Sequence, residues 1–490
     1  MNHSTLKWAC GLLLIVNIQR SFGQQGFDLA HSNHAGYSGV AWNPATLAAN
    51  RYAVQLQLAS VEAHAANSAY RYSGPWLPWH QQEGLQLTPT NLDPVNDGRT
   101  KLFDVSLQIR GPSVLVNIGK QGGIAFSVRT RQAFQGNTIA PSLLKTSIGG
   151  LTSPANWSGA TFNLNATALS EWNGSYGRVL LEKGAHQLKV GVTVKHLFGI
   201  GAAYLQGRDV NYEVLSSPAG GDSLLLVHDF QGAYGVANAD AFRELDLLKT
   251  IGWLTGRNAS GYGWGADVGV AYEYRPSSPI AEAGAPLPSD KSYRFRVGAA
   301  LVDLGSVYYD KSSRSYPSIE LHEAHVSQDD ASNFYPTNFD NKLSDIMRLR
   351  RLSAQPSLRT GLPTVLNLDL DYHMRRSLYL NAAVSQGLRG HYAIGMRSFS
   401  YASLTPRLET RGLEVAVPLY MMNDYRNFAT GFTLRFRSLR VGTNNVMGFF
   451  SKTNPYGMSC YVEGSLLEFE KGKSSKRGRH SKRRQVLTPP

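Results

Sequence analysis

Several stretches of this 490-residue chain alternate apolar and polar side chains with a period of two. Residues 187–196 read QLKVGVTVKH, with leucine and valine at every second position, and the same pattern recurs at 293–301, 365–374 and 432–437. Because successive side chains of a β-strand point to opposite faces, each stretch predicts a strand with one apolar and one polar face. The chain is therefore predicted to be all-β, either a soluble sandwich or a membrane barrel.

The first 23 residues favour the barrel, because they have the features of a secretory signal. Met1–Lys7 is short and basic, Trp8–Ile18 is apolar, and Ser21–Gly23 supplies small residues at the spacing of a cleavage site. We expect residues 1–23 to direct export and to be removed before Gln24. Cys460 is then the single cysteine left, so the exported chain needs a source of stability other than a disulfide, and a closed hydrogen-bonded barrel supplies one.

After the signal, no apolar run reaches the roughly 18 residues of a membrane helix, which leaves a barrel open because its strands alternate. Short connections alternate with long ones, as in outer-membrane barrels. The short ones are predicted at 119–123, 182–185 and 374–377, and the long ones at 61–100, 134–171 and 310–362. We predict a transmembrane antiparallel β-barrel of about 14 strands, with about 12 or 16 as alternatives, in the Gram-negative outer membrane.

Three details of this barrel are predicted from local sequence. The barrel is expected to occupy residues 51–469, with Gly457–Phe469 as the last strand, closing against the first. Residues 101–118 are expected to form one strand bent at Gly111-Pro112. The stretch 199–261 is expected to add a hairpin and a short helix at 240–254.

Residues 24–50 lie between the signal and the first strand and form neither a core strand nor an amphipathic helix. They are rich in glycine and alanine and contain Asn43-Pro44-Ala45, and both features favour defined turns and close backbone packing. We predict that this segment is a plug inside the barrel. The alternative is a disordered N-terminus.

The polar faces of the strands carry charges that a barrel would turn inward. A salt-bridged, filled interior and an anion-preferring passage are the two interpretations of these charges. We expect no catalytic, cofactor-binding or metal-binding residues and no enzyme activity. The candidate lumen charges are Arg129, Arg131, Lys189, Lys195, Arg294, Arg296, Asp369, Asp371, Glu414, Arg435 and Arg437.

The formal net charge of +14 comes mainly from the two ends of the chain. Eight basic residues lie in 471–490 and two in the signal, so the body is close to neutral and a nucleic-acid partner is not supported. Residues 470–490 are predicted to be a disordered periplasmic tail. The tail is either a solvated overhang or an electrostatic attachment to cell wall or anionic lipid.

These strand patterns resemble a family of uncharacterised outer-membrane proteins of Bacteroidota. The resemblance is carried by LQIRGPSVLVNIGKQGGIAFSVRTR (107–131), YRFRVGAALVDLGSVYY (293–309) and LPTVLNLDLDYH (362–373), and by 176–199, 263–276 and 404–419. A more distant likeness is to FadL-type transporters of hydrophobic compounds and to PorV, in which an N-terminal hatch with Asn-Pro-Ala occupies a 14-stranded barrel. Asn43-Pro44-Ala45 matches that motif and is implied to be part of such a hatch.

The sequence therefore predicts a passive outer-membrane transporter or channel for a small or amphipathic solute, surrounded by outer-membrane lipid. The rival prediction is a scaffold that transports nothing and binds a surface or secretion-system protein through its extracellular loops.

Overall fold

A computed structural model describes residues 30–72, 92–144, 155–215, 224–242, 247–276, 293–310, 313–327, 352–446 and 456–470. The predicted signal, the first six residues of the predicted plug and the tail beyond residue 470 lie outside these ranges. In the described part, the helices are all too short or too polar to cross a membrane.

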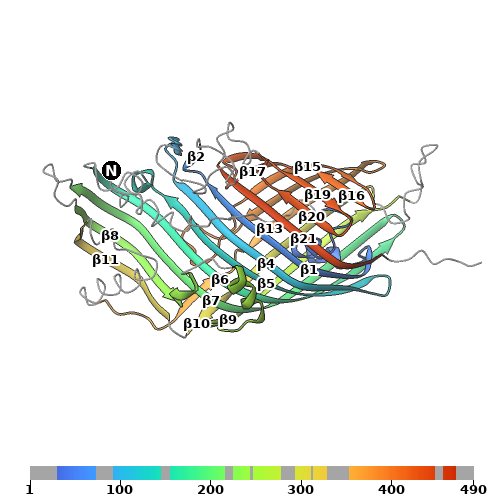
Figure 1. Ribbon diagram of the computed structural model, residues 1–490, viewed down its shortest axis with the longest axis horizontal. Helices are drawn as coiled ribbons and strands as arrows, with labels where there is room; N and C mark the ends of the chain where they lie inside the picture. Colours follow the sequence, from blue (N-terminus) through green and yellow to red (C-terminus); the bar gives the residue numbers. More distant parts are fainter. Residues whose placement is uncertain are drawn as a thin grey trace, which may run out of the picture.

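The fold is a closed antiparallel β-barrel (Figure 1). The first strand pairs with β4 on one side and with the last strand, β21, on the other, which closes the sheet as predicted. The strands of the wall are β1 (Tyr52–Asn67), β4 (Lys101–Ile118), β5 (Gly122–Ile139), β6 (Ala155–Lys183), β7 (His186–Leu215), β8 (Leu224–Ala237), β9 (Gly261–Tyr274), β10 (Phe295–Tyr309), β11 (Ser313–Ser327), β12 (Leu358–Gly361), β13 (Val365–Arg375), β14 (Leu378–Gly387), β15 (Tyr401–Glu409), β16 (Leu413–Ala416), β17 (Leu419–Met422), β18 (Asn427–Thr430), β19 (Phe432–Phe436), β20 (Leu439–Thr443) and β21 (Gly457–Glu470).

The 19 strands of this sheet occupy 14 positions around the wall, which confirms the predicted strand number. Five positions hold two consecutive segments that run along the same neighbours: β8 and β9, β10 and β11, β12 and β13, β16 and β17, and β18 and β19. The two termini of the barrel meet where Tyr52 pairs with Glu470. We call this the termini end and the opposite one the far end. A small separate sheet, β2 (Tyr70–Tyr72) with β3 (Leu92–Pro94), follows β1 at the far end.

The predicted long connections were too long, because the strands continue well beyond the apolar part of the wall. The first strand runs to Asn67, β5 runs to Ile139, β6 begins at Ala155, and β11 and β12 both fall within 310–362. Strand β4 is one strand with a register shift between Arg110 and Ser113, as predicted.

The predicted hairpin after residue 199 is the upper half of β7 paired with β8, and both are wall strands. The predicted helix at 240–254 is three short pieces, η6 (Ala239–Phe242), α4 (Leu247–Gly252) and η7 (Trp253–Thr255).

An apolar belt surrounds the outside of the barrel. On β7, the outward Val192 and Val194 are exposed, whereas the inward Thr193 is buried. Aromatic side chains border the belt toward both ends: Trp172, Phe198, Tyr262 and Trp264 form contacts on one side, and Tyr272, Tyr274 and Phe295 on the other. Ten residues of β9 separate Tyr262 from Tyr272, which corresponds to about 25 Å across the belt for a strand tilted by about 40°.

Among the described residues, two elements lie in the barrel interior besides the inward side chains. The inner segment, residues 30–50, contains α2 (Tyr37–Trp42) and η2 (Pro44–Leu47) and lies toward the termini end (Figure 1). The inner loop, residues 388–400, connects β14 to β15 and enters from the far end, where Gly395 bridges to Gly361. The inner loop was not predicted.

The inner segment rests on a row of glycines. Gly123, Gly177, Gly191 and Gly269 are direct partners across β5, β6, β7 and β9. A Cβ at any of these positions would lie less than 3.0 Å from an atom of the inner segment. Glycine is needed here because the backbone of η2 packs directly on the backbone of the wall.

Candidate functional site

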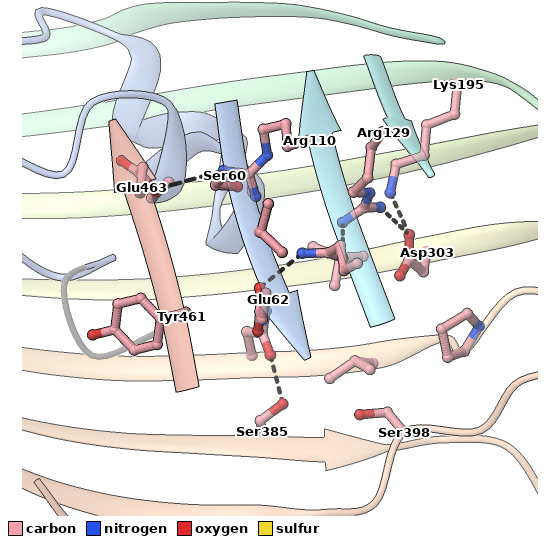
Figure 2. Close-up of a pocket in the computed structure, with 18 of the residues that line it drawn as sticks. Ser60, Glu62, Arg110, Arg129, Lys195, Asp303, Ser385, Ser398, Tyr461 and Glu463 are labelled. Atoms are coloured by element: carbon pink, nitrogen blue, oxygen red, sulfur yellow. Dashed lines mark hydrogen bonds and ion pairs between the residues drawn. The ribbon is translucent and has the colours of Figure 1, made fainter. Parts of the chain in front are cut away.

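A polar chamber lies between the inner segment and the inner loop (Figure 2). It has a volume of about 60 Å³. We define the chamber by its lining residues: Ser38, Ala41, Ser60, Val61, Glu62, Gln108, Arg110, Arg129, Lys195, Val302, Asp303, Pro363, Val365, Asn367, Ser385, Ser398, Tyr461, Val462 and Glu463.

The inner segment forms the floor of the chamber and is attached largely to charged side chains of the wall. Ser32 Oγ donates to Glu414 Oε2 at 2.8 Å, Ser38 Oγ donates to Glu463 Oε2 at 2.5 Å, and Trp42 Nε1 donates to Asp369 Oδ1 at 3.1 Å. Hydrogen bonds to an ionised partner are about twice as strong as neutral ones. The floor is therefore firmly held.

Asn43 organises the end of the inner segment that meets the glycine row. Its Oδ1 accepts a hydrogen bond from Ala45 N at 2.9 Å and so begins η2, in which Pro44 is the first residue. Its Nδ2 donates to the carbonyl oxygen of Val270 at 3.0 Å. The predicted motif Asn43-Pro44-Ala45 thus caps a short helix and docks it on the wall.

The inner loop forms the roof and is attached to the wall strands by neutral amides. Gln135 Nε2 donates to Arg397 O at 2.8 Å, and Gln135 Oε1 accepts from Arg397 N at 2.9 Å. Asn165 Oδ1 accepts from Gly395 N at 2.8 Å. One ion pair, between Arg397 and Asp424 at 3.0 Å, links the loop to the neighbouring turn.

Beside the chamber, three cations and three carboxylates form a compact network. Arg131 Nη1 lies 2.7 Å from Asp303 Oδ2, Arg129 Nη2 lies 2.6 Å from Glu171 Oε2, and Lys195 Nζ lies 2.6 Å from Asp267 Oδ1. Lys195 also contacts Asp303. The network is neutral as a whole, and each carboxylate has a cationic partner.

Asp303 owes its place in this network to a bulge in β10. The register between β9 and β10 shifts between Leu301 and Leu304, and Asp303 has a φ of 57°. Its backbone N–H donates to Asp267 Oδ1 at 2.7 Å. A bulge turns a side chain away from its regular direction, and here it aims the carboxylate at Lys195 and Arg131.

Most predicted lumen charges are buried inside the barrel. Those are Arg129, Arg131, Lys189, Lys195, Arg296, Asp369, Asp371, Glu414 and Arg435. Two predictions were wrong. Arg294 precedes the ladder of β10 and donates to the outward Tyr372 Oη at 2.5 Å, and Arg437 is exposed in the turn after β19, with a φ of 52°.

Several charged residues of the interior were missed by the sequence prediction, although their alternation along the strands was the available signal. Arg110 and Glu62 line the chamber, and Glu171, Asp267 and Asp303 complete the network. In the described ranges there is no cluster of three His, Cys, Asp or Glu arranged to hold a metal ion.

A model of a family of unknown function, DUF5723, matches residues 44–443. The chain belongs to this family. No curated protein matches the chain. The predicted origin in Bacteroidota stays a prediction.

Three solved structures are similar to the chain over most of its length. The toluene transporter TbuX of Ralstonia pickettii is 9% identical, with 92% of this chain and 98% of that chain covered and a TM-score of 0.38. The toluene transporter TodX of Pseudomonas putida is 10% identical, with 91% and 96% covered and a TM-score of 0.38. The translocator domain of the autotransporter NalP of Neisseria meningitidis is 9% identical, with 90% and 98% covered and a TM-score of 0.33. The function of this family member is therefore inferred from its own interior.

Proposed function

We propose that this DUF5723 protein is an outer-membrane transporter held in an occluded state, through which a small polar solute passes by way of the chamber. The observation that carries the proposal is a polar chamber that lies between two separate inner elements, one toward each end of the barrel. The apolar belt, about 25 Å tall and bordered by aromatic side chains, supports membrane insertion.

The two inner elements differ in how they are held, and this suggests which one opens first. A neutral hydrogen bond contributes about 0.5–1.5 kcal/mol net, and bonds to ionised groups contribute more. The inner loop is attached to the wall strands by neutral amides and has one carboxylate partner, Asp424. The inner segment is attached to three carboxylates, Glu414, Glu463 and Asp369. We infer that the inner loop moves first and opens the far end of the barrel. The inner segment then acts as a plug that closes the termini end.

Solute uptake by liposomes that contain the purified barrel tests the proposal. Replacing Gln135 and Asn165 by alanine removes amides that hold the inner loop and should raise uptake. Gln121→Ala, in the exposed turn between β4 and β5, is the matched control. Deleting the inner segment should raise the conductance of single barrels. If wild-type, loosened and deleted proteins all give no uptake above empty liposomes, the protein is not a transporter.

The second candidate function is a scaffold that transports nothing. It is favoured by the length of β6 and β7, 29 and 30 residues, and by the extension that they form with β8 and β11 beyond the other strands at the far end (Figure 1). Such an extension offers strand surface to a protein partner. Co-purification of a partner in a fixed ratio, without uptake by any variant, would support the scaffold.

A further inference from the structure

We propose that the chamber binds a small zwitterion, with the carboxylate of the ligand on Arg110 and its ammonium group on Glu62. The proposal rests on the proposed transport function and names the solute class. Arg110 projects from β4 and Glu62 from β1, and both are more than nine-tenths buried. Figure 2 shows the two side chains on neighbouring strands, facing the same space.

Arg110 has hydrogen-bonding capacity that the protein leaves unused. Its Nη1 lies 3.4 Å from Ser38 Oγ and 3.9 Å from Glu463 Oε2, both longer than an ordinary charge-assisted bond. Its Nε has no hydrogen-bond partner. Glu463 is engaged by Arg440 and by Ser38, so it does not neutralise Arg110 fully.

Burying a guanidinium group whose hydrogen bonds are incomplete costs folding free energy, and a carboxylate ligand would complete these hydrogen bonds. Guanidinium and carboxylate groups form two parallel hydrogen bonds of matching geometry. The ring of Tyr37 lies 5.2 Å from the Arg110 guanidinium carbon and covers one face of the group, which leaves its edge for in-plane hydrogen bonds. By contrast, Arg129 makes short hydrogen bonds to Glu171 and is satisfied within the protein.

Glu62 supplies the opposite charge at a suitable place. Its Oε2 accepts a hydrogen bond from Gln108 Nε2 at 2.9 Å, and an ionised carboxylate accepts hydrogen bonds from an ammonium group. In the pairing of β1 with β4, Ser60 is opposite Arg110 and Glu62 is opposite Gln108. Arg110 and Glu62 are therefore diagonal neighbours, about 7–8 Å apart between backbones.

The charge balance of the chamber favours a zwitterion over a simple ion. Its lining has three cations, Arg110, Arg129 and Lys195, and three carboxylates, Glu62, Asp303 and Glu463. A free anion or cation would add an unbalanced charge to an enclosed site, whereas a zwitterion adds none. An apolar solute would leave the polar lining without partners. The chamber, with a volume of about 60 Å³, is small, which favours a compact ligand.

The test uses the full-length barrel in liposomes and three labelled solutes: L-alanine, propionate and isopropylammonium. Because a hydrogen bond to a charged group changes affinity by roughly tenfold or more, L-alanine should enter about tenfold faster than either single ion. Glu62→Gln keeps the shape of the side chain and should abolish the preference for L-alanine over propionate, because only the ammonium group loses its partner. Glu182→Gln, at the exposed end of β6, is the matched control and should retain it.

The outcomes separate the two proposals. Equal entry of all three solutes into wild-type liposomes would overturn the zwitterion site and leave the transporter intact. No entry of any solute, even with the inner loop loosened, would overturn the transporter and this inference with it. If Glu62→Gln does not fold, judged by heat-modifiable migration, Arg110→Gln replaces it. Unchanged L-alanine preference in a folded variant of either residue would also refute the site.

Discussion

The row of glycines under the inner segment gives the sharpest test of how that segment is held. A Cβ at Gly191 would lie 2.3 Å from the carbonyl carbon and oxygen of Pro44, whereas ordinary contacts begin at 3.4 Å. Both atoms belong to backbone, so a side-chain rotation cannot relieve the overlap. In Gly191→Ala the inner segment must retreat by about 1 Å, because a packed interior has no free space to absorb the methyl group.

The free energy of docking should fall accordingly. Overpacking by one methyl group costs about 1–3 kcal/mol, and the hydrogen bond from Asn43 to Val270 contributes about 1 kcal/mol more when it breaks. A total of about 2–4 kcal/mol raises the detached population about 30- to 700-fold. Alanine is the better strand residue, so the barrel wall itself should not weaken.

Limited proteolysis of folded barrels measures this population, because cleavage follows the fraction of open molecules when opening is fast. Cleavage near Trp42, which is buried in the wild type, should accelerate by that factor in Gly191→Ala. Gly174→Ala on β6 is the control, because a Cβ there meets nothing within 4 Å. Cleavage of Gly191→Ala at the wild-type rate would show that the inner segment does not dock on the glycine row.

Three further predictions concern the wall, the far-end extension and the tail. Val192→Arg, in the apolar belt, should cost about 2–4 kcal/mol of folding free energy, whereas Leu215→Arg, at the far end of β7, should cost close to none. The folding yield into liposomes measures both losses, and equal losses would mean that the belt does not face lipid. The hydrogen bond to Glu323 raises the pKa of His228, so this bridge between β8 and β11 is present at low pH and is lost as the pH rises through the folded-state pKa. The protection of β8 amides, measured as the exchange rate relative to the intrinsic rate at each pH, should therefore be lower at about pH 8 than at about pH 6, and pH-independent protection would contradict this. Truncation after Glu470 should abolish the salt-sensitive sedimentation of the protein with cell wall, because each basic residue near an anionic surface contributes about 1 kcal/mol to binding. Unchanged sedimentation of the truncated protein would identify the tail as a solvated overhang.

The wall of the barrel was predictable because a period of two is a local property of the sequence. The predictions failed where alternate residues no longer lie on opposite faces of a regular strand. Arg294 lies before the first paired residue of β10 and Arg437 lies in a turn, so counting alternate residues placed both on the wrong side. Strand ends were missed for a related reason: beyond the apolar belt the apolar residues move to the buried face of the strand, as Val210, Tyr212 and Val214 do in β7, so the pattern of the belt does not continue.

The site was only partly predictable. Asn43-Pro44-Ala45 indicated a docked segment, but the matching glycines lie on four strands whose register no local pattern specifies. The roof of the chamber depends on Gln135 and Asn165, which in the sequence are ordinary polar residues on inward faces. The far end is closed by hydrogen bonds between residues more than 200 positions apart in the chain. No periodic pattern in a single sequence indicates which distant residues will form such bonds.

The position of the inner segment has a consequence for how the protein is assembled. This segment precedes the first strand, yet Ser32 and Ser38 bind Glu414 and Glu463, which belong to β16 and to the last strand. The earliest part of the described chain therefore finds some of its partners last, because its hydrogen bonds to Glu414 and Glu463 cannot form until β16 and β21 are in place. Contacts so distant in sequence form late because the intervening chain must be ordered first. During assembly the wall of the barrel should thus close before the inner segment is fully bound.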